Sequence, residues 1–295
     1  MEQTAESYET QSLSNGHICL EYLVNAGPRI IGLYYGDSQE NLFAILPGVG
    51  WKTPYGWFSM YGGHRLWHSP EAADRTSIPD DQPPAIEKID GGLKISQAVE
   101  APTGIAKSIV VRFQPDRSSV VVDHYLTNKG VWPVPLAPWA ITQLRLGGIA
   151  VIPQITQPLD SAGLLPNRSL VLWPYTSWQD ERLKLHDDLI LVEGTPQLPP
   201  IKIGCVNPHG WLGYFYKEFM FIKRFDYLPE QPYPDFGSNS ECYCNDKFIE
   251  VESLGPLTNL EPDQTVQYTE TWELHKLSGE VRSIGDIRQV IKEKI

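Results

Sequence analysis

Two glutamates, Glu250 and Glu252, stand at a spacing that could serve acid–base chemistry. If their segment is a β-strand, both carboxylates leave it on one face, roughly 7 Å apart along the chain, because strand side chains alternate with a period of two. Ile249 and Val251 then point to the opposite face, into a core. Two carboxylates on one face require water or cationic partners, since an unpaired buried charge is costly. We therefore predict that this segment belongs to the functional site.

A second group of reactive side chains lies in residues 61–71, which read YGGHRLWHSPE. Trp67 could stack on the face of a sugar, while His64 and Arg65 could donate hydrogen bonds to its hydroxyl groups. The glycine pair before them permits a turn with positive φ. The alternative is a structural turn in which Arg65 pairs with Glu71. We expect the first reading and treat all three side chains as candidate ligand contacts.

Two further candidates lie on strands with apolar neighbours. His124 shares a strand face with Val120, Val122 and Leu126, so it is either a core histidine or a ligand contact. Lys223 stands among phenylalanines and would need a carboxylate, for which Glu250 or Glu252 would serve. The alternative is that its long side chain reaches past the edge of the sheet to water.

Aromatic and acidic residues in loops complete the set of candidates. Indoles above a β-sandwich can line a carbohydrate cleft or cap the core, and we include Trp139 among the substrate contacts. Asp235 and Glu241 could add carboxylates to the same region, or could serve turn geometry. A calcium site formed by Asp235, Glu241 and Glu250 is left open, and no metal site is predicted. The loop tryptophans are Trp132, Trp139, Trp173 and Trp178.

The elements that must position these residues read mostly as short strands separated by Gly, Pro, Asn and Asp. Residues 283–295 carry apolar residues at helical spacing and predict a short C-terminal helix. We find no internal repeat or linker, so we predict one all-β sandwich domain over residues 1–295. The predicted strands are 17–24, 29–35, 42–46, 93–97, 105–114, 119–128, 140–144, 189–193, 202–205, 211–216, 218–227, 248–253 and 265–276.

Composition excludes several classes of function. The net charge is −12 and no basic cluster exists, which argues against a nucleic acid partner. No apolar run approaches the roughly 18 residues of a membrane-spanning helix, and the polar N-terminus has no signal-peptide pattern. The four cysteines suggest no disulfide framework, so we expect free buried thiols and a cytoplasmic protein. Motifs for nucleotides, NAD, serine hydrolases and zinc peptidases are absent, and we predict no cofactor.

Several segments together resemble the galactose mutarotase-like superfamily, the aldose 1-epimerases and their relatives. Within it, the sequence is most similar to a bacterial family without an assigned function. The resemblance covers nearly the whole chain and implies a β-supersandwich with an open sugar-binding cleft on one sheet. It is carried by GPRI at 27–30, GGHRLWHSPE at 62–71, LTNKG at 126–130, PLAPW at 135–139, LPNRSLVLWPY at 165–175, FIKRF at 221–225, YPDFG at 233–237 and EVESLGPL at 250–257.

The resemblance also implies roles for particular residues. Mutarotases use a late glutamate as the base that removes the proton of the anomeric hydroxyl, and this glutamate maps onto Glu252. Arg65 falls about where the family places a sugar-binding arginine. The family's acid, a histidine in a His-x-Tyr-Phe motif, is missing: PWAITQ stands at 138–143 instead. The proton donor to the ring oxygen would then have to be another group, and His64, His68 or His124 are the candidates.

Three functions remain open at this stage. The first is anomer interconversion of a sugar, with Glu252 as general base and His64 as acid, and with Arg65 and Lys223 holding substrate oxygens. The second is a carbohydrate-binding protein without catalysis, which the missing acid and the many tryptophans favour. The third is a glycoside hydrolase or lyase that uses Glu250 and Glu252, although two carboxylates on one strand would lie on one side of the sugar.

Overall fold

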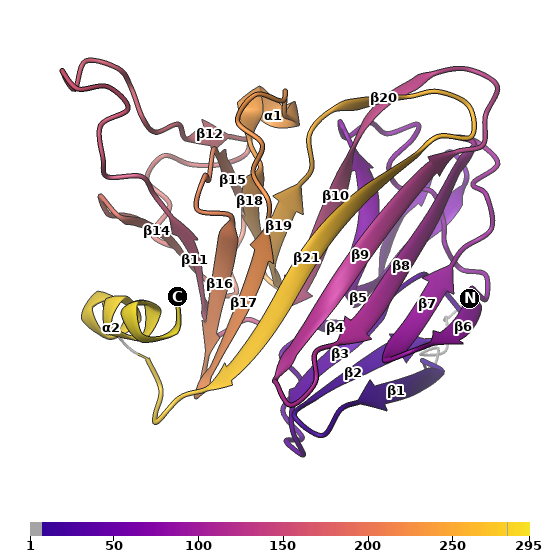
Figure 1. The fold of residues 1–295 in the computed structure, drawn as a ribbon, viewed down its shortest axis with the longest axis horizontal. Helices are drawn as coiled ribbons and strands as arrows, with labels where there is room; N and C mark the ends of the chain where they lie inside the picture. Colours follow the sequence, from indigo (N-terminus) through magenta and orange to yellow (C-terminus); the bar gives the residue numbers. More distant parts are fainter. Residues whose placement is uncertain (1–7, 282) are drawn as a thin grey trace.

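The computed structural model describes residues 8–281 and 283–295 and consists of two large antiparallel sheets that face each other (Figure 1). Apolar side chains from both sheets meet between them in one continuous core, which includes Leu20, Phe43, Phe221, Ile249 and Trp272. The predicted all-β sandwich with a short C-terminal helix is therefore observed.

The first sheet carries most of the predicted site residues. Its spatial order is β1, β2, β3, β5, β10, β19, β18, β15, β12, with β4 added to β5 and β20 added to β10. These strands are β1 Thr10–Ser14, β2 Ile18–Leu23, β3 Ile30–Tyr35, β4 Ile45–Thr53, β5 Gly56–Ser69, β10 Val134–Leu144, β12 Val171–Leu172, β15 Ile201–Cys205, β18 Ser240–Cys244, β19 Ile249–Leu254 and β20 Thr258–Leu260.

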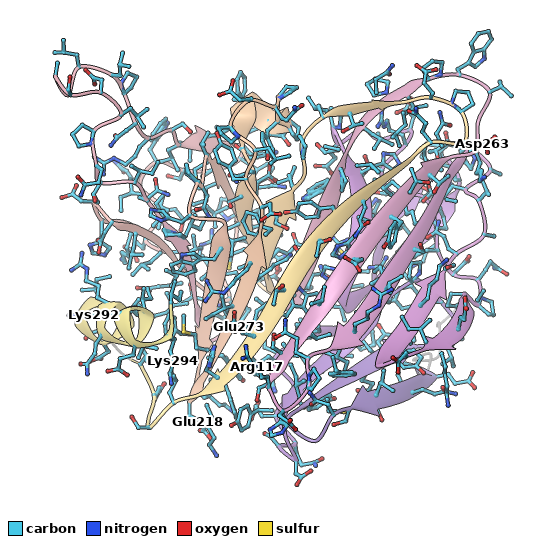
Figure 2. The ribbon with its side chains drawn as sticks, in the orientation of Figure 1. Arg117, Glu218, Asp263, Glu273, Lys292 and Lys294 are labelled. Carbon is cyan, nitrogen blue, oxygen red and sulfur yellow. The ribbon has the colours of Figure 1, made fainter. Side chains whose placement is uncertain are left out.

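The second sheet has the order β13, β14, β11, β16, β17, β21, β9, β8, β7, β6. Charged side chains such as Glu218 and Asp263 lie in turns at opposite ends of this sheet (Figure 2). Its strands are β6 Ala85–Ile89, β7 Gly92–Ser96, β8 Ile105–Phe113, β9 Ser119–Asn128, β11 Ile149–Pro153, β13 Leu183–Leu185, β14 Leu189–Glu193, β16 Trp211–Tyr216, β17 Phe219–Phe225 and β21 Thr265–Lys276.

Helices contribute little to the fold. A single turn, α1, spans Pro234–Gly237, and α2 spans Ile284–Lys294 as the C-terminal pattern predicted. Ser283 caps α2 in a reciprocal pair with Asp286, and Ile287 is buried against the outer face of the second sheet. Neither helix is long and apolar enough to cross a lipid bilayer.

The segment around the glycine pair, for which a structural turn was the alternative reading, is part of the long strand β5, which changes partner in its middle. Residues up to Gly62 pair with β4, and residues from Gly63 onward pair with β10. The φ angles of Tyr61, Gly62 and Gly63 are 55°, 104° and 64°, which L side chains rarely adopt. A Cβ on Gly62 would lie 2.0 Å from the carbonyl oxygen of Ala44. The glycines thus form a bend inside the strand and do not end it.

Several strands were not predicted in full. β10 begins at Val134, whereas the predicted strand began at residue 140. The prediction started too late because two prolines in this stretch suggested a loop. β4 runs to Thr53, well beyond the predicted end at residue 46, and β18 was not predicted. The cysteines are free as expected, and Cys205, Cys242 and Cys244 are buried.

Candidate functional site

β19 directs its two carboxylates to the outer face of the first sheet. Ile249 and Val251 point into the core between the sheets, so the alternation predicted for this strand is confirmed. Register places Glu252 beside Ile141 of β10 on one side and Glu241 of β18 on the other. The outer face therefore brings together carboxylates from two adjacent strands.

Lys202 of β15 supplies the cation that these carboxylates require. Its ammonium lies 2.8 Å from Oε2 of Glu241 and 3.0 Å from Oε2 of Glu252. It also lies 4.4 Å from the ring centre of Trp139 and 4.7 Å from that of Trp173, a cation–π arrangement. Burial opposes its charge, but the two carboxylates outweigh burial and raise the pKa of Lys202. The ammonium therefore stays protonated at neutral pH.

Arg65 and Glu250 form a second ion pair on the same face. Arg65 Nη2 donates to Glu250 Oε1 at 3.0 Å, and its guanidinium lies 4.3 Å from the ring centre of Trp67. Arg65 thus pairs with Glu250, and the alternative bridge to Glu71 is not formed. Burial raises the pKa of Glu250 to about 7 although Arg65 favours its charged form. A carboxyl group with this pKa can both accept and donate a proton near neutral pH.

These residues line a cavity of about 350 Å³, which we call the inner cavity. Its floor carries Arg65, Lys202 and Glu250, and Glu71 and Lys247 also line it. Pockets that combine apolar walls with a few fixed polar groups are typical of small-molecule sites. The aromatic side chains in its walls are Trp51, Trp67, Trp139, Tyr175, Tyr243 and Phe248.

Glu252, the base predicted from the sequence, lies behind this floor. Its side chain is fully buried and does not line the inner cavity. Oε2 accepts hydrogen bonds from Trp139 Nε1 at 2.7 Å and from Lys202 Nζ at 3.0 Å. Oε1 has no hydrogen-bond partner among the described residues. Glu252 therefore orients Lys202 and Trp139, the two residues in front of it.

His64, His124 and Lys223 were predicted to contact the ligand, but the structure does not bring them to the cavity. All three are fully buried between the two sheets. His64 Nε2 lies 2.7 Å from His124 Nε2, and Lys223 Nζ lies 3.0 Å from Glu270 Oε1. Lys223 thus pairs with Glu270 and not with Glu250 or Glu252. Burial lowers the pKa of both histidines, which favours their neutral forms.

Within residues 8–281 and 283–295, one group of side chains has the convergence needed for a metal ion. Ligand atoms of His64, His124 and Glu270 lie within 4.8 Å of one another. The two histidines are already bonded to each other, and Glu270 is paired with Lys223, whose positive charge disfavours a metal cation. The calcium trio left open above does not converge in the same way: Glu241 pairs with Lys202 and Glu250 with Arg65.

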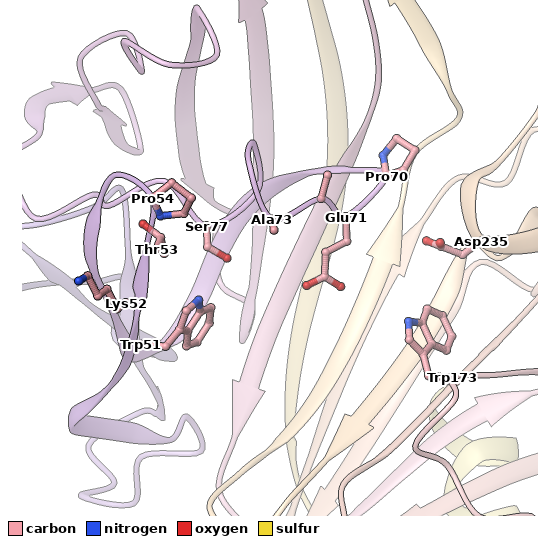
Figure 3. Close-up of a pocket in the computed structure, with 11 residues that line it drawn as sticks. Trp51, Lys52, Thr53, Pro54, Pro70, Glu71, Ala73, Ser77, Trp173 and Asp235 are labelled. Carbon is pink, nitrogen blue, oxygen red and sulfur yellow. The ribbon is translucent and has the colours of Figure 1, made fainter.

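Asp235 lies in a neighbouring cavity of about 590 Å³, which we call the outer cavity (Figure 3). Glu71 and Trp51 line both cavities, so the two adjoin. Burial of the Glu71 carboxyl group against the cavity walls raises its pKa, although the residue as a whole is exposed. Among the predicted contacts, Arg65, Trp67, Trp139 and Glu250 thus line the inner cavity, and Asp235 lines the adjoining outer cavity.

Sequence reasoning missed Lys202 as a site residue. It stands between Ile201 and Ile203, and both isoleucines are in the core. A lysine flanked by two core residues on a short strand must face the other side, where its charge requires carboxylates. That signal was present in the sequence, but its partners lie on β18 and β19, about 40 to 50 residues away.

Solved structures with the same fold come from proteins related to galactose mutarotase. A galactose mutarotase-like protein from Lactobacillus casei has a TM-score of 0.53 and 12% identity, covering 90% of this chain and 100% of its own. An Escherichia coli K12 protein provisionally assigned as an aldose 1-epimerase has a TM-score of 0.59 and 11% identity, with coverages of 92% and 100%. A galactose mutarotase related enzyme from Lactobacillus acidophilus gives 0.55 and 9%, with coverages of 93% and 100%.

These matches confirm the galactose mutarotase-like fold. No protein-family model and no curated protein matches the chain. At 9–12% identity the likeness concerns the fold, and the chemistry has to be argued from the cavity itself.

Proposed function

We propose that this protein binds a sugar in the inner cavity and interconverts its anomers, with Glu250 as the general base. The observation that carries the proposal is the combination of three features in one cavity. Glu250 has a pKa of about 7, Arg65 and Lys202 are fixed cations, and indole rings form the walls. A carboxylate with a pKa near the working pH is suited to proton transfer.

In this proposal Glu250 takes the proton of the anomeric hydroxyl group as the bond between the anomeric carbon and the ring oxygen breaks. The Lys202 ammonium gives a proton to the ring oxygen, and an open-chain aldehyde results. After rotation, the ring hydroxyl attacks the other face of the aldehyde and returns its proton to Lys202. Glu250 then returns its proton to the new anomeric oxygen. Fixed cations stabilise the negative charge that develops on oxygen.

Glu252 has a positioning role in this proposal. It holds Lys202 and Trp139 from behind, whereas a base has to come within about 2.6–3.2 Å of the proton it removes, directly or through one water molecule. The mapping from the family resemblance instead names Glu252 as the base. The two assignments differ in which glutamate is essential, and this difference can be tested directly.

A non-catalytic carbohydrate-binding protein is the second candidate. One observation favours it: His64, His68 and His124, the three candidates for the missing family acid, are all buried and none lines the inner cavity. If Lys202 cannot protonate the ring oxygen, the cavity would bind a sugar without opening its ring.

The test is NMR measurement of anomer exchange for a panel of aldoses, with Glu250→Gln and Glu252→Gln compared with the wild type. Exposed Glu261→Gln is the matched control. We expect Glu250→Gln to lose about 100-fold or more in rate, Glu252→Gln to keep measurable exchange, and the control to match the wild type. The wild-type rate should rise with pH through about 7, because the base must be ionised.

Two other outcomes would redirect the assignment. Exchange that survives in Glu250→Gln but is abolished in Glu252→Gln would make Glu252 the base, as the family resemblance implies. Sugar binding without accelerated exchange for any aldose would establish the second candidate.

A further inference from the structure

The outer cavity has no role in the reaction proposed above. Its volume of about 590 Å³ exceeds the roughly 350 Å³ of the inner cavity, and the two share Trp51 and Glu71 as walls. A single sugar ring bound at Arg65, Lys202 and Glu250 would occupy the inner cavity alone. A ligand that extends past Glu71 would enter the outer one.

The walls of the outer cavity resemble those of the inner cavity in chemical type. Figure 3 shows the Glu71 carboxylate between the indoles of Trp51 and Trp173, with Asp235 beside Trp173. Trp51 is 37% exposed and Trp173 is half-buried, so both rings present apolar surface to a ligand. Indoles offer broad apolar contact, and carboxylates accept hydrogen bonds from hydroxyl groups.

The backbone that presents Asp235 is held in an unfavourable conformation. Asp235, Phe236 and Gly237 have consecutive φ angles of 49°, 57° and 90°. Each non-glycine residue in this region costs on the order of 1 kcal/mol or more, and such residues concentrate at ligand-binding positions. Ser238 fixes the turn, because its hydroxyl donates to the carbonyl oxygen of Asp235 at 2.8 Å.

We propose that the outer cavity is a second sugar subsite, so that the substrate is a reducing oligosaccharide whose terminal ring lies in the inner cavity. The inference rests on the proposed function, because it takes the inner cavity as the site of the reducing ring. The next ring would lie between Trp51 and Trp173, and the bond between the two rings would pass Glu71.

The charges in the outer cavity select a neutral ring. Its charged residues are two carboxylates, Glu71 and Asp235, and one lysine, Lys52. A phosphate or carboxylate substituent would meet net negative charge there and be repelled. Hydroxyl groups would instead find acceptors in the two carboxylates.

The experiment is calorimetric titration of the full chain with glucose and galactose, and with the reducing disaccharides maltose, cellobiose, lactose and melibiose. We expect at least one disaccharide to bind roughly tenfold or more tightly than the monosaccharide at its reducing end. Trp173→Ala removes one wall, and Ala73→Trp fills the outer cavity from an exposed position. Both variants should bring the disaccharide affinity down to that of the monosaccharide.

Trp132→Ala is the matched control, because this indole is 76% exposed and does not line the outer cavity. It should keep the full preference for the disaccharide. Ala73→Trp also guards against misfolding, since it adds bulk at the surface and removes no buried contact.

The outcomes separate this inference from the proposed function. If monosaccharides bind and none of the disaccharides binds better, the second subsite is refuted while the proposed function stands. A disaccharide preference that survives both Trp173→Ala and Ala73→Trp refutes it as well. If no sugar binds at all, the proposed function fails and the subsite fails with it.

Discussion

Replacement of Glu250 by glutamine should change how the stability of the protein depends on pH. The Glu250 side chain is 8% exposed, and burial raises its pKa from 4.5 to about 7. In the unfolded chain the carboxyl group ionises at the lower pKa, so the unfolded state releases its proton first as pH rises. The free energy of unfolding of the wild type therefore falls between pH 4.5 and pH 7, and this contribution is constant above pH 7. Glutamine does not titrate, so the variant lacks this fall.

The size of the effect follows from the two pKa values. At about 1.36 kcal/mol per pKa unit, the interval from 4.5 to about 7 corresponds to about 3 kcal/mol. Most of this change should appear between pH 5 and pH 8. The attraction to Arg65 acts only while Glu250 is ionised, so it is already contained in the pKa of about 7 and adds no separate dependence on pH.

The assay is urea denaturation of the wild type and of Glu250→Gln at four pH values from 5 to 8, followed by tryptophan fluorescence. The free energy of unfolding of the variant minus that of the wild type should increase with pH by about 2–3 kcal/mol. Exposed Glu261→Gln should give a difference that is flat with pH. A flat difference for Glu250→Gln would refute the raised pKa, and with it the argument that Glu250 is matched to proton transfer near neutral pH.

Two further predictions concern the support of the site. Lys223→Met leaves Glu270 buried without its cation and should lower the free energy of unfolding, measured in urea, by about 3–5 kcal/mol. Lys217→Met breaks an exposed ion pair and should lower it by at most about 1 kcal/mol. Equal losses for the two variants would contradict the argument from burial. Gly63→Ala would put a Cβ 2.1 Å from a backbone carbonyl oxygen, whereas Gly91→Ala has a similar φ but open space. Thermal denaturation should therefore show a loss for Gly63→Ala of about 2 kcal/mol or more beyond that of Gly91→Ala, and similar losses would mean that the strand adjusts freely.

Patterns within one segment predicted the local parts of the structure. Alternation of apolar and polar residues identified β19 and β21 and placed Glu250 and Glu252 on one face. Helical spacing identified α2. These inferences need only the period of the backbone, which each segment carries by itself. The extent of the domain over residues 1–295 and the cytoplasmic location stay predictions.

The composition of the site could not be predicted in the same way, because it depends on register between distant strands. Lys202 meets Glu241 and Glu252 only because β15, β18 and β19 are neighbours in the sheet, an order that the sequence does not display. His64 and Arg65, which were both expected to contact the ligand, are separated for a simpler reason. Adjacent residues of one strand point to opposite faces, so Arg65 faces the cavity and His64 faces the core. The sequence did not indicate that His64 and Arg65 lie on one strand, because the glycine pair before them also permits a turn.

The buried side of the first sheet explains why the cavity floor can hold its geometry. Lys223 donates to the carbonyl oxygens of Ala140 at 2.7 Å and Val251 at 3.3 Å, and so joins β10 to β19 from behind. These are the strands that present Trp139 and Glu250 to the cavity. Because a reactive group has to be held by rigid neighbours to act in a fixed geometry, this buried lysine serves the site without touching its ligand. Burial lowers the pKa of Lys223, whereas the Glu270 carboxylate favours the charged form. Glu270 therefore stabilises the ammonium that joins the two strands.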